Sequence, residues 1–244
     1  KYTCRIWHTM LFIITLFNKT QEQIQIKNCV IEENGSSDEK VSSHQFKQGR
    51  GAHVTAECYL KESILKKVQR TSADKLMECF IPSQKLTKID GMFGYNINVA
   101  NAIAAIFAAT GQDLGSLHES SVGILNLEKK EDGLLFKLTL PTLVVGTVGG
   151  GTSLPKQNEM LHLMKCEGNG NLKRFAQLIT AFALSLEIST FAAIVSGEFA
   201  KAHEKLGRNK PVNLLTQSEI NEPFIRQIMG EMDPKHKALS IHLN

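Results

Sequence analysis

Four glycines fall within the seven residues 146–152, directly after the apolar run 140–145. Glycine has no Cβ, so such a loop can adopt positive φ angles and direct successive N–H groups toward one point, as phosphate and oxyanion sites require. A flexible turn after a strand is the alternative. The loop has neither the GxGxxG pattern of dinucleotide folds nor the GK[ST] of phosphate-binding loops. It therefore indicates an anion or cofactor contact or a simple turn, and no more.

Two ionisable side chains stand at the ends of expected helices. Asp113 follows the helical pattern of 92–110, where the helix dipole disfavours a negative charge, so this carboxylate is either solvated or recruited for chemistry. His203 lies near the end of the helical pattern of 171–205. The dipole there favours the protonated imidazole, which suits a general acid that protonates a leaving group. A solvated surface histidine explains the same position.

The segment 92–110 is apolar on nearly every side, and we expect it to form a core helix. Asn98 and Asn101 interrupt its apolar surface three residues apart, and hence on one face. Buried amides need hydrogen-bond partners. The two side chains are therefore either an internally satisfied pair or a ligand contact near the N-terminal half of the helix.

Composition indicates a folded protein with a sizeable core. Of the 244 residues, 42% are hydrophobic and 21% are charged. Lys and Arg exceed Asp and Glu by only 28 to 24, and aromatic residues are 7%. This excess is too small to predict a nucleic-acid partner, and none is expected. Residues 60–88 carry seven basic residues against three acidic ones, which predicts a local basic patch suited to an anionic ligand.

The five cysteines are odd in number and scattered, with no CxxC pair. We expect reduced thiols in a cytoplasmic protein rather than a disulfide framework or a metal site. The apolar run 10–17 is far shorter than the roughly 20 residues that span a bilayer, so a buried strand or helix is favoured over a signal-peptide core. No membrane segment is expected in this chain, whereas an anchor before Lys1 stays open.

Hydrophobic periodicity predicts the elements that must position these groups. A polar, turn-rich connector covers 18–53. Alternation predicts a strand over 54–59, and two further apolar strands, 122–127 and 134–140, form a hairpin that leads into the glycine loop. Helices are expected over 60–68, 73–80, 92–110, 155–164 and 171–205, the last with one break. The last 25 or so residues are polar, and we expect them to fray.

Four motifs follow one another along the chain, and both their order and the distances between them match one known family. They are Gly-Gln-Asp at 111–113, Gly-Thr-Val-Gly-Gly-Gly-Thr at 146–152, Leu-Glu-Ile-Ser at 186–189, and the segment 202–209 that contains Ala-His-Glu-Lys-Leu-Gly-Arg-Asn. In this set the chain resembles the hydroxymethylglutaryl-CoA reductases. The resemblance covers about residues 35–215, and the form of the glycine loop is similar to that of the NADPH-using branch.

The resemblance implies reduction of 3-hydroxy-3-methylglutaryl-CoA to mevalonate with two NADPH, at sites formed between the subunits of a homodimer or higher oligomer. No metal is implied. The implied catalytic residues are Asp113, His203 and Lys40. The implied cofactor contacts are Val148, Gly149, Gly150 and Arg208. The implied contacts to substrate and CoA are Val68, Gln69, Arg70, Asn101, Ser189 and Ala202, with Arg70 as a phosphate partner.

The sequence also departs from the family pattern. The family loop Asp-Lys-Lys-Pro, whose first lysine is catalytic, reads Asp38-Glu39-Lys40-Val41 here, so Glu39 takes the aligned place and Lys40 serves only if the loop shifts by one residue. The Asp-Ala-Met-Gly-Met-Asn cofactor motif is absent, and the proton-donating glutamate of the family lies upstream of Lys1. Two hypotheses follow: an active oxidoreductase domain, or a catalytically impaired relative that retains CoA binding and dimerisation.

The resemblance also implies the architecture. We expect an α/β chain of α+β type, with a large helical domain around a buried central helix, short strands and the remnant of a small N-terminal domain. The expected parts are a poorly matched remnant of a cofactor-binding domain at 1–34, a connecting catalytic loop at 35–53, a large substrate and CoA domain at 54–215 and a tail at 216–244.

Overall fold

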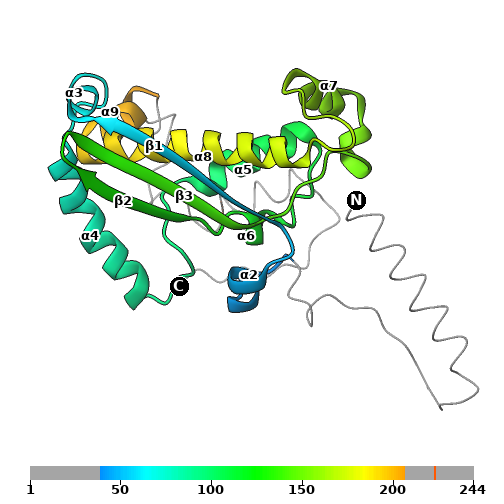
Figure 1. The fold of residues 1–244 in the computed structure, drawn as a ribbon, viewed down its shortest axis with the longest axis horizontal. Coiled ribbons are helices and arrows are strands. Elements are labelled where there is room, and N and C mark those ends of the chain that lie inside the picture. Colours follow the sequence, from blue (N-terminus) through cyan, green and yellow to red (C-terminus); the bar gives the residue numbers. More distant parts are fainter. Residues whose placement is uncertain (1–38, 207–222, 224–244) are drawn as a thin grey trace, which may run out of the picture. The chain divides into compact units, whose positions relative to one another are not determined.

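The computed structural model describes residues 39–206 and Pro223. The chain divides into two compact units, 1–199 and 200–244, and each is considered by itself. In the first unit a small antiparallel sheet is combined with helices (Figure 1). The fold is therefore of the mixed α+β class, which confirms the expected fold class.

The sheet has three antiparallel strands in the order β1-β3-β2. The strands are β1 (Ala52–Lys61), β2 (Ile124–Lys130) and β3 (Gly133–Leu143). Strict alternation along β1 sends every second side chain to solvent. On this solvent face the Thr55 and Thr139 hydroxyls bond at 3.0 Å, and Lys137 pairs with Glu57 at 2.9 Å. The opposite face is apolar and forms the core.

Helix α8 packs on the core face of the sheet, α5 packs against α8, and α4 lies along one end of the sheet (Figure 1). The helices of the described residues are α2 (Ser43–Gln48), α3 (Glu62–Lys67), α4 (Ala73–Ile89), α5 (Val99–Thr110), α6 (Leu117–Ser120), α7 (Pro155–Leu163), α8 (Leu172–Val195) and α9 (Glu198–Lys205), with the 3₁₀ turn η2 (Gly150–Ser153). Gly197, between α8 and α9, stands at φ 74°, the left-handed conformation that commonly ends a helix.

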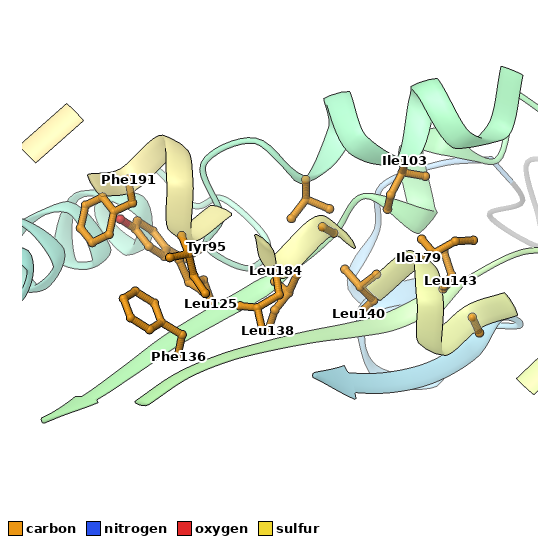
Figure 2. Packing of buried hydrophobic residues seen from close by; sticks show 14 of the residues in the cluster. Tyr95, Ile103, Leu125, Phe136, Leu138, Leu140, Leu143, Ile179, Leu184 and Phe191 are labelled. Atoms are coloured by element: carbon orange, nitrogen blue, oxygen red, sulfur yellow. The ribbon is translucent and has the colours of Figure 1, made fainter. Parts of the chain in front are cut away.

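The core lies between the sheet and α8. Leu138 and Phe136 of β3 meet Leu184 and Phe191 of α8, while Ile103 of α5 closes the layer (Figure 2). Each of these side chains is at most 3% exposed. At roughly 25 cal/mol per Å² of apolar surface, burial of this layer is the main force that holds α8 on the sheet and α5 on α8.

The observed helices differ from the expected ones mainly at their ends. The helix expected over 92–110 begins only at Val99, because residues 92–98 form the loop that brings Tyr95 beside Ile124 of β2. It is also not buried all round, since Asn101 and the alanines 100, 105, 108 and 109 are exposed. Alanine is apolar but small, so it marks either a core or a close-packing surface.

Other boundaries also moved. The connector expected over 18–53 contains α2, whose start is capped by Ser42 accepting the N–H of Gln45 at 3.2 Å. The helix expected over 73–80 continues to Ile89, and β2 continues to Lys130, which shortens the hairpin turn. The strand at 54–59, the helix that starts at Pro155 and the break in 171–205 are confirmed.

Among the described helices, α8 alone is long and apolar enough to cross a membrane by length and composition. Ten of its residues are buried within this chain, including Phe175, Ile179 and Phe191. Such burial is what a core helix of a globular domain also shows, so α8 is weak evidence for a membrane span.

Candidate cofactor and substrate site

The whole glycine loop 146–152 lines a cavity of about 750 Å³ in the first unit. Asp113, Arg50 and Lys173 line the same cavity. The structure thus brings the expected cofactor contacts Val148, Gly149 and Gly150 together with the expected catalytic aspartate. Gly149 and Gly150 have φ of 79° and 56°, so the loop depends on backbone conformations that side chains disfavour.

The C-terminal end of α5 is fixed to this loop by close backbone packing. Gly111 ends the helix in the left-handed conformation, at φ 67°. Its backbone lies against Gly151, where an added Cβ would stand 2.5 Å from the Gly111 carbonyl oxygen. Neither position has room for a side chain. The Gly-Gln-Asp and glycine-loop motifs are therefore two halves of one packed contact.

Gln112 adds two hydrogen bonds to this contact, one accepted and one donated by its side-chain amide. Its Oε1 accepts the N–H of Gly146 at 2.7 Å, and its Nε2 donates to the Gly146 carbonyl at 3.0 Å. The Nε2 also donates to the Thr110 carbonyl at 3.2 Å. One side chain thereby satisfies both peptide groups at the start of the loop.

The second residue of the glycine loop, Thr147, is hydrogen bonded to the turn that precedes α8. The Thr147 hydroxyl donates to the Gly168 carbonyl at 2.8 Å, and the Gly168 N–H donates to the Thr147 carbonyl at 3.0 Å. The N-terminus of α8 consequently faces the cavity through Asn169, Gly170 and Lys173. A helix N-terminus and a lysine together favour an anionic group.

Asp113 lies in the exposed turn after α5. Its Oδ1 accepts the N–H of Gly115 at 3.0 Å, which orders the turn. Lys40 lies at the same turn, because a smaller cavity of about 450 Å³ is lined by Lys40, Glu39, Gly115 and His118. The side chain of Glu39 packs against Gly115. The structure therefore brings the loop of Lys40 to the turn of Asp113.

Asn101 and Ser189 are both exposed, on the neighbouring helices α5 and α8. The Asn101 amide donates to the Oδ1 of Asn98, and the Asn98 amide donates to Thr190 at 3.2 Å. Asn98 is the N-cap of α5 and not a position within its first turn. The asparagines are thus partly satisfied by each other, while Asn101 remains open to a ligand.

Glu187 holds the N-terminal end of α5 from a buried position on α8. It is 0% exposed, and its carboxylate accepts the N–H of Ile97 at 2.8 Å and the N–H of Asn98. Burial raises the pKa of Glu187, and the backbone N–H groups of Ile97, Asn98 and Val99 oppose that rise by stabilising the charged form. A carboxylate at a helix N-terminus also complements the helix dipole.

Residues 68–70 lie at the other end of the sheet, just after α3 (Figure 1). Val68 is 64% exposed, and Arg70 stands at φ 55° with its guanidinium 3.7 Å from Glu198. In the described chain, none of these three residues lines the glycine-loop cavity. Within one copy the expected CoA contacts are therefore separated from the expected cofactor contacts.

Ala202 and His203 lie on α9, within the unit that begins at Ala200. His203 is in the last turn of that helix, as the sequence predicts, and is partly buried. Arg208 falls outside the described residues, as do Asp38 and the segment 1–34. Among the described residues, no group of three or more His, Cys, Asp and Glu side chains is placed to hold a metal ion.

Sequence reasoning missed several residues that line the cavity or hold the elements around it. Gln112 and Glu187 stood inside quoted motifs, but their types alone do not reveal which peptide groups they bind. Arg50 was read only as part of a turn, and Glu119, its buried partner, carried no signal. Neither a charge 69 residues distant nor a backbone partner can be read from local spacing.

Comparisons with known proteins identify the family of the chain. The family model for hydroxymethylglutaryl-coenzyme A reductase matches residues 9–208. The chain is 36% identical over 189 residues to the 3-hydroxy-3-methylglutaryl-coenzyme A reductase of Methanocaldococcus jannaschii, over 77% of this chain and 47% of that protein. It is 38% identical over 181 residues to the Aeropyrum pernix reductase, over 72% and 43% of the two chains.

A plant relative is similar to the same extent. The chain is 35% identical over 186 residues to 3-hydroxy-3-methylglutaryl-coenzyme A reductase 1 of Oryza sativa subsp. indica, over 72% of this chain and 34% of that protein. The chain thus spans less than half the length of each of these relatives. With the family model matching most of its residues, the chain belongs to the hydroxymethylglutaryl-coenzyme A reductase family.

Proposed function

We propose that this chain is part of an enzyme that reduces the thioester of 3-hydroxy-3-methylglutaryl-CoA to mevalonate and free CoA, with NADPH as the reductant. The observation that carries the proposal is a single cavity, in a chain of this family, that is lined by both the glycine loop and Asp113. When bound, NADPH supplies the hydride for each reduction step.

The residues of the cavity fit a nicotinamide cofactor. Positions 149 and 150 have open space where a Cβ would stand, so a ligand can approach the backbone closely. Lys173 at the α8 N-terminus supplies positive charge for a phosphate. Gln112 and the Gly168 carbonyl hold the first two residues of the loop, Gly146 and Thr147, which orients this end of the loop before a ligand arrives.

The remaining roles concern charge and protons at the thioester. The ammonium of Lys40 stabilises the oxyanion that forms at the thioester carbonyl. Asp113 supports that charge from the same turn, and His203 protonates the departing CoA thiolate. Asn101 and Ser189 contact the substrate from the exposed face of α5 and α8, and Arg70 contacts a CoA phosphate.

A homodimer explains why the expected contacts are spread over one copy. The exposed residues of α5 and α8 include many small ones, together with the large apolar side chains of Phe182, which is 55% exposed, and Ile194, which is 41% exposed. Small residues permit close packing of a second copy. A site between two copies would use Asn101 and Ser189, which lie on this face, together with contacts from both subunits.

The dimer is tested by sedimentation of the chain and of Phe182→Glu. A buried charge at a dimer face is destabilising, so the variant is expected to be monomeric where the parent is a dimer. Ile89→Glu, at a position that is 78% exposed on α4, is the matched control and should leave the dimer intact. A monomeric parent, or a Phe182→Glu dimer, overturns this interface.

The reductase activity is tested by following the absorbance of NADPH in the presence of the acyl-CoA. Oxidation that depends on the acyl-CoA supports the proposal. Lys40→Ala should lower turnover by about a hundredfold, as loss of one oxyanion contact does, whereas Lys47→Ala, on the exposed side of α2, should not. Binding of both ligands without oxidation would instead favour the impaired relative, and unchanged turnover in Lys40→Ala removes Lys40 from the mechanism.

A cytoplasmic location is part of the same proposal. The cysteines of the described residues, Cys58, Cys79 and Cys166, are free thiols. Free thiols suit a reducing compartment. Fractionation of cells that express the full-length protein, with an antibody to this chain, tests whether this part faces the cytoplasm.

A further inference from the structure

Glu119 is a fully buried carboxylate on the short helix α6, with an exposed fraction of 0%. Its Oε1 accepts the Nη2 of Arg50 at 2.6 Å and the Nε of Arg50 at 3.1 Å. A buried carboxylate is tolerated only when it is paired and hydrogen bonded. The fork of the Arg50 guanidinium supplies such a partner, and Arg50 itself lines the glycine-loop cavity.

The same carboxylate binds the loop that carries Lys40. The backbone N–H of Glu39 donates to the Oε1 of Glu119 at 3.2 Å. Glu39 stands at φ 57°, a conformation that is uncommon for a residue with a side chain and needs support from its surroundings. Glu39 and Lys40 both line the smaller cavity, so this contact anchors its wall to α6.

The backbone around Glu119 binds the strand that leads into the glycine loop. The Thr142 hydroxyl donates to the Glu119 carbonyl at 2.7 Å, and the Val144 N–H donates to the Ser120 hydroxyl at 3.0 Å. Val144 also lines the larger cavity. Residues 39–50 and the strand residues 142–144, far apart in sequence, therefore meet at one short helix.

From this arrangement we propose that Glu119 is a positioning residue that holds the Glu39–Lys40 loop and Arg50 in register with the glycine-loop cavity. As the described residues define them, Glu119 lines neither cavity, so it acts through its partners and not by contact with a ligand. Its effect on turnover rests on the proposed function, whereas its hold on the two segments does not.

The test is amide hydrogen exchange of the whole chain carrying Glu119→Gln. Peptides that cover 39–47 and 48–51 are expected to exchange about tenfold faster than in the parent, because the carboxylate binds the Glu39 N–H and the Arg50 guanidinium. Peptides over 143–149 should keep the parent rate, since the Glu119 carbonyl and the Ser120 hydroxyl that bind this strand are unchanged. Peptides from the β1–β3 pair should keep the parent rate. Glu57→Gln, which removes an ion pair on the solvent face of the sheet, is the matched control and should leave both segments unchanged.

Enzyme kinetics provide the second test of the proposal. In Glu119→Gln, kcat per folded molecule should fall by about tenfold, with the KM for NADPH nearly unchanged, because the displaced Lys40 acts in the transition state. Unchanged local exchange in the folded variant overturns the proposal, and so does a uniform rise over the whole chain, which would mean a purely structural ion pair.

If Glu119→Gln does not fold, a second variant that keeps the positive charge at position 50 tests the proposal. Arg50→Lys keeps the ion pair but lacks the fork that orients the carboxylate, so exchange over 39–47 should rise by a few-fold. No rise in that variant also overturns the proposal. If the parent chain oxidises no NADPH, the reductase function fails, and the exchange experiment still decides the role of Glu119.

Discussion

The two ends of α5 are held by opposite kinds of contact. At the N-terminal end a buried charge on α8, Glu187, accepts the N–H groups of Ile97 and Asn98. At the C-terminal end two uncharged backbones, those of Gly111 and Gly151, lie too close for any side chain, and Gln112 closes the contact with the Gly146 peptide group.

The two kinds of contact fix different properties of the helix, its direction and its distance from a neighbour. A carboxylate that faces several N–H groups fixes the direction of a helix and responds to pH. Backbone packing fixes distance and is insensitive to pH but intolerant of a single added carbon. The end near Asn101 and Ser189 is therefore electrostatically held, and the end near the glycine loop and Asp113 is sterically held.

The largest effect is expected from Gly111→Ala. The added methyl overlaps the Gly151 carbonyl and must also adopt φ 67°, so the free energy of unfolding should fall by about 3 kcal/mol or more. Urea unfolding measures the change. Gly91→Ala is the matched control, since Gly91 has φ 71° and nothing within 4 Å of an added Cβ, and it should cost only about 1 kcal/mol. Equal losses would show that the Gly111–Gly151 packing is unimportant.

Glu187→Gln should lower the free energy of unfolding by about 2 kcal/mol, because an amide accepts one N–H with its oxygen and turns a donor toward the other. Glu78→Gln, at an exposed position on α4, should leave it unchanged. The comparison of the two variants by urea unfolding isolates the buried contact. A loss in Glu187→Gln no larger than in Glu78→Gln would contradict the electrostatic account of this end.

The pH dependence of that loss has a defined sign. Burial raises the pKa of Glu187 above its ordinary value of 4.5, so the folded chain holds this proton more tightly than the unfolded chain. The contribution of Glu187 to the free energy of unfolding is therefore fully present below pH 4.5 and decreases as the pH rises through the pKa of the folded state. The difference between parent and Glu187→Gln should narrow over the same rise in pH. A difference that widens instead contradicts the raised pKa.

The smallest effect is expected from Gln112→Glu. The carboxylate can still accept the Gly146 N–H but cannot donate to the Gly146 carbonyl, so about 1 kcal/mol of stability should be lost. The KM for NADPH should rise, because the start of the glycine loop is less ordered. Gln177→Glu, on the exposed side of α8, is the control. An unchanged KM would show that Gln112 supports the fold and not the loop.

Much of the local structure was predictable from sequence. Alternation marked β1, Pro155 marked the start of α7, and the pattern of 171–205 indicated one break, which the structure places between α8 and α9. The start of α5 was not predictable, because Met92, Phe93 and Ile97 extend the apolar pattern of the helix toward the N-terminus, whereas its end at Thr110 agrees with the prediction. What keeps residues 92–98 out of the helix is the pairing of Tyr95 with β2 and the Glu187 carboxylate at Asn98, both distant in sequence.

The sequence by itself determined the family, the α+β class and the motifs that carry chemistry, because spacing within a motif is local and survives without coordinates. Only the tertiary structure decided which motifs share a cavity. It placed the glycine loop with Asp113 and Arg50, put residues 68–70 at the other end of the sheet, and left Asn101 and Ser189 on an exposed helical face. The reason is physical: buried charges and backbone contacts select partners by position in space, which residue types alone do not encode.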